Sequence, residues 1–220
     1  IDIQTDIVLT TVDHSTGSDF AVPSITGALI INGNGHSIIR SGATSFGLTD
    51  FSAALTISEL TVSDFSQIVL KGDGPVDITD SVFSNNSEAV LYTDFGGSAH
   101  PWSITDSEFL DNSSSGRGIV AKEDGGTLTI SGSTFSDNTN LDNFDGSAVR
   151  YTNGNSGETV SITDSVFSSN TYTTGGCGAF GLSASQDVNI QIDNTVFESN
   201  VSEFCGGAIS VESGFAFATI

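Results

Sequence analysis

Short apolar runs alternate along the chain with stretches rich in Ser, Thr, Asn, Asp and Gly, and this alternation repeats. In five segments an Ile stands five residues before a Phe, and an Asn stands three residues after that Phe. The Ile positions are Ile78, Ile104, Ile130, Ile162 and Ile192; the Phe positions are Phe83, Phe109, Phe135, Phe167 and Phe197; the Asn positions are Asn86, Asn112, Asn138, Asn170 and Asn200. Recurrence at three fixed positions identifies an internal repeat.

A second apolar run follows the Asn in each copy, for example at residues 89–91, 118–120 and 147–149. A small residue precedes the apolar ones, as expected where the chain turns a corner into another strand. Each repeat therefore contains at least two short β-strands separated by tight polar turns. No window shows the 3.6-residue apolar period of an amphipathic helix, so the fold class is all-β.

The spacing of the repeats predicts a solenoid. Ile57 and Ile31 extend the series toward the N-terminus, with a start near Ile7, and successive copies lie 21 to 32 residues apart. Uneven coils fit a stacked structure whose insertions bulge at the turns. We expect a right-handed, single-stranded parallel β-helix of about eight coils, forming one domain over residues 1–220.

Stacking of equivalent positions follows from this fold. Coils about 4.8 Å apart would place the repeated Ile in one column and the repeated Phe in another, and both columns would form the core. The repeated Asn would form a ladder of side-chain amides, which satisfies buried turn groups that would each cost about 1–3 kcal/mol unpaired. Ile220 falls on the Ile position of a further coil. We therefore expect a segment of a longer solenoid or a filament subunit with uncapped ends.

The charge balance excludes some partners. The chain has 27 Asp and Glu against 5 Lys and Arg, a formal net charge of −22. Nucleic acids and anionic lipid surfaces attract basic proteins, so neither is expected as a partner. No apolar stretch approaches the roughly 18 residues of a membrane span. The acidic surface fits either salty surroundings or an assembly bridged by cations.

Calcium is the one metal that the repeat suggests, although no cofactor is required. Asp80, Asp106 and Asp164 share one repeat position, where the other two copies have Gly132 and Asn194. Stacked carboxylates repel by roughly 1 kcal/mol per pair in water-like surroundings, and Ca²⁺ prefers oxygen ligands. The alternative is that Asp simply favours a turn at this position.

Two cysteines and three sequons indicate secretion. Cys177 and Cys205 fall one position out of register on adjacent coils, close enough for a predicted disulfide, which implies an oxidising compartment. Glycosylation sequons begin at Asn85, Asn112 and Asn200. Asn112 and Asn200 belong to the predicted ladder, so Asn85 is the best glycosylation candidate.

Two motifs carry a resemblance to known proteins. Residues 197–200 (Phe-Glu-Ser-Asn) and 206–209 (Gly-Gly-Ala-Ile) resemble the repeat of chlamydial polymorphic outer-membrane proteins. Residues 29–38 look like the first coil of pectate-lyase-like β-helices. The resemblance covers roughly residues 25–220 and implies a β-helix of a kind found in adhesins, large surface proteins and carbohydrate-active enzymes. Such a fold does not by itself assign a function.

An enzyme is not expected. Lyases on this fold need a basic residue beside carboxylates, and no two of the five cations fall in one column near the repeated Asp. Glycosidases need two carboxylates about 5–9.5 Å apart, but the repeated Asp look like parts of the repeat. Rows of Ser and Thr beside the core Ile are typical of ice-binding solenoids, yet Asp77, Gln191 and Asp193 interrupt them.

The leading hypothesis is an extracellular or cell-surface structural or adhesive module. It would bind other copies of itself, other surface proteins, or glycans. Self-association through its ends or faces would form a filament. The alternatives are a carbohydrate-active β-helix that binds or cleaves polysaccharides, and an ice-binding solenoid. An enzyme should show a cleft with a localised Lys or Arg beside Asp.

Overall fold

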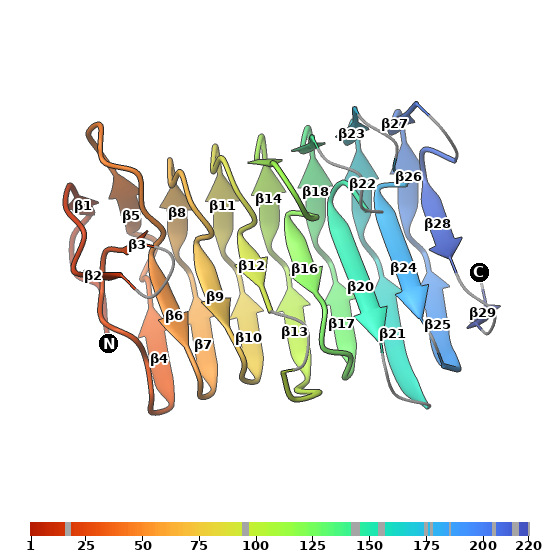
Figure 1. Ribbon diagram of the computed structural model, residues 1–220, viewed down its shortest axis with the longest axis horizontal. Helices are drawn as coiled ribbons and strands as arrows, with labels where there is room; N and C mark the ends of the chain where they lie inside the picture. Colours follow the sequence, from red (N-terminus) through yellow and green to blue (C-terminus); the bar gives the residue numbers. More distant parts are fainter. Residues whose placement is uncertain are drawn as a thin grey trace.

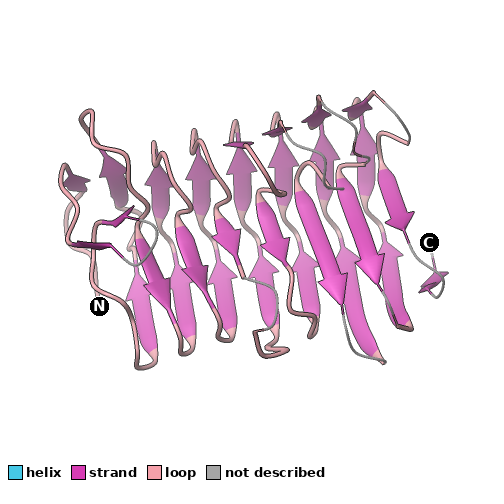
Figure 2. Cartoon of the chain, viewed as in Figure 1, coloured by secondary structure: helices cyan, strands magenta, loops and turns pink. Residues whose placement is uncertain are grey.

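The computed structural model describes residues 1–15, 19–93, 97–141, 146–153, 157–173, 176, 178–184, 186–203, 206–212 and 216–219. These residues form a parallel β-solenoid of about seven turns, close to the predicted eight, and contain no helix. The coils follow one another in chain order along the long axis of the molecule, with the termini at opposite ends (Figures 1 and 2). The prediction of an all-β parallel solenoid is confirmed.

The first sheet contains the repeated Ile. Its strands are β4 (Leu29–Asn32), β7 (Leu55–Ser58), β10 (Val76–Thr79), β13 (Trp102–Thr105), β17 (Leu128–Ser131), β21 (Glu158–Thr163), β25 (Val188–Asp193) and β29 (Ala216–Thr219). Ile31, Ile57, Ile78, Ile104, Ile130, Ile162 and Ile192 pair in one register through this sheet. All seven are buried, so the inward face of the strands from β4 to β25 is apolar, as the alternating pattern requires. Ile220 lies outside the described residues.

The second sheet contains the repeated Phe. It is formed by β1 (Ile7–Leu9), β5 (Ser37–Arg40), β8 (Thr61–Ser63), β11 (Val82–Ser84), β14 (Glu108–Leu110), β18 (Thr134–Ser136), β22 (Val166–Ser168) and β26 (Val196–Glu198). The rings from Phe83 through Phe197 stack nearly parallel, with successive centroids 5.1, 4.7, 4.9 and 4.8 Å apart. The ring spacing equals the strand spacing of a sheet, so the aromatic column fits the coil rise without distortion.

The predicted position of Ile7 is wrong. Ile7 pairs with Ile38 in the second sheet, in the column that leads to the Phe, and not with Ile31 in the first sheet. The place next to β4 is taken by Asp2, which bridges to Asn32. Ile7 precedes both Ile31 and Ile38 by a number of residues that fits the repeat, so spacing alone could not decide between the two sheets.

The second apolar run of each repeat forms the third sheet. It contains β6 (Thr49–Phe51), β9 (Leu70–Gly72), β12 (Leu91–Tyr92), β16 (Val120–Lys122), β20 (Val149–Asn153), β24 (Phe180–Ala184) and β28 (Ile209–Glu212). A short fourth sheet, β15 (Ser113–Ser114), β19 (Thr139–Asn140), β23 (Thr171–Tyr172) and β27 (Val201–Ser202), lies between the second and third along the chain. One antiparallel pair, β2 (His14–Ser15) and β3 (Asp19–Phe20), lies near the first coil.

Two turns of each coil use the left-handed backbone conformation. Between the first and second sheets, φ is 48° at Asp80, 48° at Asp106, 59° at Gly132, 50° at Asp164 and 46° at Asn194. After the second sheet, the residue before each ladder Asn is also left-handed, as at Asn85 with φ 56°. Asn, Asp and Gly adopt this conformation most readily, which explains why they occupy every one of these positions except Ser169 and Ser199.

Candidate functional site

The repeated Asn form a continuous hydrogen-bonded ladder. The backbone N and the Nδ2 of Asn112 both donate to Oδ1 of Asn138, each at 3.1 Å, and Asn112 Nδ2 also donates to the carbonyl of Phe83 at 2.9 Å. The same bonds join Asn86 to Asn112, Asn138 to Asn170, and Asn170 to Asn200. From Asn86 to Asn170 these side chains are no more than 1% exposed, so their role is to hold adjacent coils together.

A second ladder was missed by the sequence analysis. The hydroxyl of Ser107 accepts from Ser81 N at 3.2 Å and donates to the carbonyl of Thr105 at 2.8 Å. Ser81, Ser133, Ser165 and Thr195 make equivalent bonds. The signal was present in the sequence, because a hydroxyl residue stands three positions after every repeated Ile.

The repeated Asp make contacts along their own column. A carboxylate oxygen of Asp106 lies over the next coil at Gly132, in the space that a Cβ would occupy there. Asn194 Nδ2 donates to Asp164 Oδ1 at 2.5 Å. Within the described ranges, no three His, Cys, Asp or Glu side chains gather as a metal site. The left-handed turn favours Asp at these positions, and calcium binding there stays a prediction.

The remaining predicted sites are placed as follows. Asn85 is exposed at its turn, whereas Asn112 is 1% exposed and Asn200 is half-buried. Cys177 and Cys205 lie outside the described residues, so the proposed disulfide remains a prediction.

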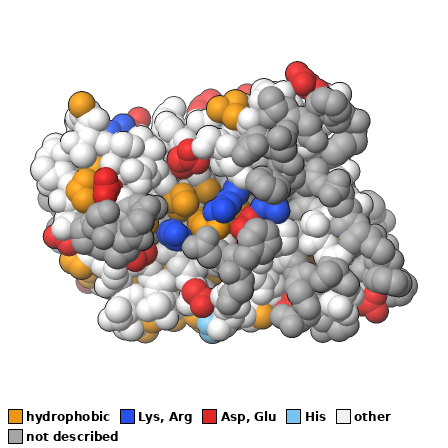
Figure 3. Space-filling view, viewed as in Figure 1, with side chains coloured by type: hydrophobic (Ala, Val, Ile, Leu, Met, Phe, Trp, Pro, Cys, Tyr) orange, Lys and Arg blue, Asp and Glu red, His pale blue; other side chains and the backbone are white. Residues whose placement is uncertain are grey.

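The third sheet departs from the repeat where it carries Lys and Arg. Lys71 in β9 and Arg150 in β20 lie in one row of the sheet, and Arg117 lies just before β16. Lys122, at the end of β16, lies in the next row and faces the interior. We call these four residues the cationic cluster. They are four of the five Lys and Arg in a chain with 27 acids. Figure 3 shows Lys and Arg side chains together in a hollow, beside apolar and acidic side chains.

Tyr92 lies at the centre of the outer part of the cluster. Lys71, Tyr92, Ala121 and Arg150 form one row across β9, β12, β16 and β20. The guanidinium of Arg117 lies 4.0 Å from the centroid of the Tyr92 ring, and Lys71 Nζ lies 5.9 Å from it. Both distances are within the range of cation–π attraction.

Glu123 joins the two arginines. Its Oε1 accepts a hydrogen bond from Arg150 Nη1, and its Oε2 lies 3.8 Å from Arg117 Nε. The Glu123 side chain is fully buried and that of Arg150 is 8% exposed. A carboxylate removed from water needs such partners, so the arginines stabilise the buried charge of Glu123.

A second, deeper group surrounds Lys122. Its side chain is fully buried, with Nζ 3.0 Å from Asp124 Oδ1 and 4.8 Å from the Trp102 ring. Burial lowers the pKa of Lys122, and the charge of Asp124 opposes this shift. The Tyr151 hydroxyl lies 2.8 Å from the carbonyl of Gly126 and 2.9 Å from Glu158 Oε2. Burial, reinforced by Glu158, raises the pKa of Tyr151.

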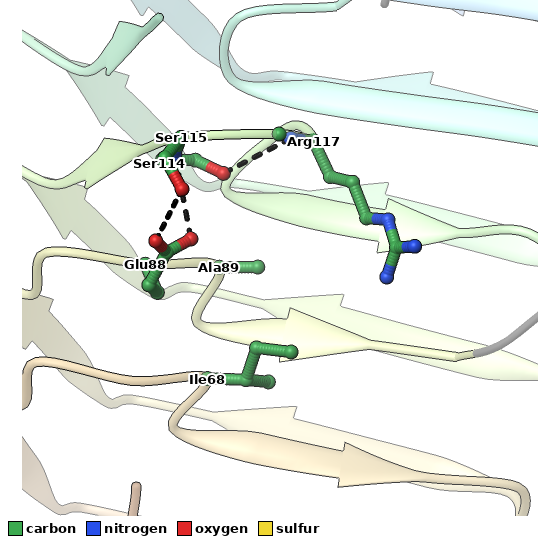
Figure 4. A pocket seen from close by; sticks show the side chains of 7 residues that line it. Ile68, Glu88, Ala89, Ser114, Ser115 and Arg117 are labelled. Atoms are coloured by element: carbon green, nitrogen blue, oxygen red, sulfur yellow. Dashed lines mark hydrogen bonds between the residues drawn. The ribbon is translucent and has the colours of Figure 1, made fainter. Parts of the chain in front are cut away.

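A cavity of about 220 Å³ lies beside the outer part of the cluster, between the turns that precede the third sheet. Ile68 and Ala89 give it apolar surface, while Glu88, Ser115 and Arg117 give it polar groups. Glu88 accepts hydrogen bonds from the backbone N and the hydroxyl of Ser115. Figure 4 shows the Arg117 side chain extending from the cavity wall toward the neighbouring coil.

The sequence analysis did not anticipate the cationic cluster. It placed no two cations in one column near the repeated Asp, whereas Lys71 and Arg150 share a row of the third sheet. The signal lay one residue beyond the aligned apolar runs, because Lys71, Tyr92, Ala121 and Arg150 each directly follow such a run.

Comparison of the chain with protein-family models, curated proteins and solved structures gives no match. Among the residues that the structure describes, none belongs to a helix long and apolar enough to cross a membrane.

Proposed function

We propose that the chain is a rigid structural or adhesive module of an extracellular surface. The observation that supports this function most strongly is the unbroken register of the Phe stack and the Asn ladder from coil to coil. Coils joined in this way form a stiff rod, and repetitive rods of this kind present extended lateral surfaces. The resemblance to chlamydial surface-protein repeats and the predicted Cys177–Cys205 disulfide are parts of the same proposal.

Assembly into filaments, with cations between acidic faces, is the form of this function that we would test first. Negative-stain electron microscopy of the native protein, with and without a calcium chelator, distinguishes the outcomes. Long regular fibres that fray on chelation would support cation-bridged assembly. Short isolated rods under both conditions would contradict it and leave a monomeric adhesive or spacer module.

Glycan binding is the second candidate, and the cationic cluster is the observation that favours it. A hollow with Lys and Arg beside carboxylates is the feature expected of a carbohydrate-active solenoid. The half-buried Arg117 borders a cavity that offers both apolar and polar groups, as sugar-sized ligands require.

A glycan array with three proteins tests this candidate. Wild type should bind a defined set of glycans, and Arg117→Ala should weaken that binding at least tenfold. Arg40→Ala is the matched control, because Arg40 is the one cation outside the cluster and bonds to backbone carbonyls of Asp64, Gly42 and Thr44. Equal binding by both variants, or no binding by wild type, would reject a glycan site at Arg117.

A further inference from the structure

Lys122 and Asp124 form an ion pair, and their amine and carboxyl groups are also the two groups that can condense to an amide. Both side chains are fully buried, and Lys122 Nζ lies 3.0 Å from Asp124 Oδ1. The ring of Trp102 covers one side of the amine at 4.8 Å. The hydroxyl of Thr93 donates to the same Asp124 oxygen at 3.2 Å, which withdraws electrons from the carboxyl group.

The other oxygen of Asp124 is the unusual feature. Within the described part of the chain, Asp124 Oδ2 is buried and has no hydrogen-bond partner. A charged carboxylate in the interior normally has both oxygens satisfied, because an unpaired buried charge is strongly unfavourable. Loss of this oxygen would remove the unsatisfied group and the buried ion pair together.

We propose that Lys122 and Asp124 form an intramolecular amide bond. Proton transfer across the contact leaves a neutral amine and a neutral carboxylic acid. The Lys122 nitrogen lone pair attacks Asp124 Cγ, the bond from Cγ to Oδ2 breaks, and Oδ2 leaves as water with one proton from the acid and one from the nitrogen. The products are one amide and one water molecule, so no oxidant or co-reactant is needed.

The surroundings favour each step. Burial lowers the pKa of Lys122, so the neutral, nucleophilic form of the amine is more populated than in an exposed lysine. Lys122 ends β16 and Asp124 follows two residues later, so the fold keeps the amine and the carboxyl group in contact. No encounter between separate molecules is needed. The inference concerns covalent structure and does not depend on the proposed surface or glycan-binding function.

Mass spectrometry of the native purified protein tests the proposal. After denaturation and trypsin digestion, cleavage after Lys122 should be absent. The resulting segment from Gly118 to Arg150 contains no cysteine and no sequon, and it should be lighter than its sequence mass by one water molecule. Fragmentation should locate the loss to a Lys122–Asp124 link. A wild-type segment at its full sequence mass would overturn the proposal, whatever the variants do.

A succinimide at Asp124–Gly125 would also lose one water and must be distinguished. Lys122→Met removes the amine but leaves Asp124–Gly125 intact, so this variant should return to its full sequence mass. Hydroxylamine should leave the wild-type mass loss unchanged, because an amide resists it and a succinimide does not. Persistence of the loss in Lys122→Met, or its reversal by hydroxylamine, would assign it to the succinimide and reject the amide.

Discussion

Individual side chains inside the solenoid bond to more than one coil, and Asn138 shows the consequence. Its Oδ1 accepts two hydrogen bonds from Asn112, and its Nδ2 donates to the Phe109 carbonyl and to Asn170. Asn138→Ala should lower the free energy of unfolding by about 3 kcal/mol or more, since buried groups left unpaired cost about 1–3 kcal/mol each. Urea unfolding monitored by circular dichroism measures the loss.

Asn200→Ala is the comparison, because Asn200 ends the described ladder and is half-buried. Water can reach the groups left by this substitution, so the loss should be clearly smaller. If both variants lose the same free energy of unfolding, burial does not determine how much a ladder Asn stabilises the protein.

Tyr151 should make the protein sensitive to alkali. Its folded-state pKa is raised above the ordinary 10.0, so above that pH the unfolded chain releases a proton that the folded chain keeps. The unfolded state then binds fewer protons, and stability falls as pH rises. Tyr151→Phe should reduce this slope in unfolding measured well above pH 10.5, where the amine of Lys122, whose folded-state pKa is lowered, carries no charge in either state. An unchanged slope would assign the alkaline loss to other groups.

At the scale of elements, the sequence predicted most of the fold because each element recurs. Ile, Phe and Asn occupy fixed places in five copies, so strands, register and ladder could be inferred from their spacing alone. The first coil lacks that pattern, and Ile7 was therefore placed in the wrong sheet. The contact of Lys122 with Asp124 could not be predicted, because it belongs to one coil and depends on how that coil turns.

The left-handed turns between the first and second sheets permit a direct test of why Asp recurs there. Asp106 is exposed with φ 48°, so Asp106→Val should cost about 1–2 kcal/mol of unfolding free energy through backbone strain, while Asp106→Asn should cost little. Asp77→Val is the control, because Asp77 is exposed on the extended strand β10. If Asp106→Asn is as damaging as Asp106→Val, the carboxylate itself is required, as a calcium ligand would be.

For the whole molecule, the net charge of −22 opposes compaction. Stability should therefore rise between low and high NaCl, since salt screens repulsion between exposed carboxylates. A gain of about 1–2 kcal/mol would raise the Tm by roughly 2–8 °C for a chain of this size. Thermal melts in MgCl₂ or CaCl₂ at equal ionic strength separate screening from bridging. A Tm that does not change with salt concentration would show that the Asp and Glu side chains lie too far apart to repel one another effectively.

The shared register of the first two strands of neighbouring coils also has a genetic consequence. The coils that begin at Ile78 and Ile104 are each 26 residues long. Their Ile, Phe, Ser and Asn positions match at this spacing, while the third strand is shifted, so that Leu91 pairs with Val120. Unequal recombination between such copies would delete or duplicate a whole coil and leave the Ile, Phe, Ser and Asn columns continuous. The length of the rod could thus change by about 4.8 Å at a time, with each new junction already compatible with its neighbours.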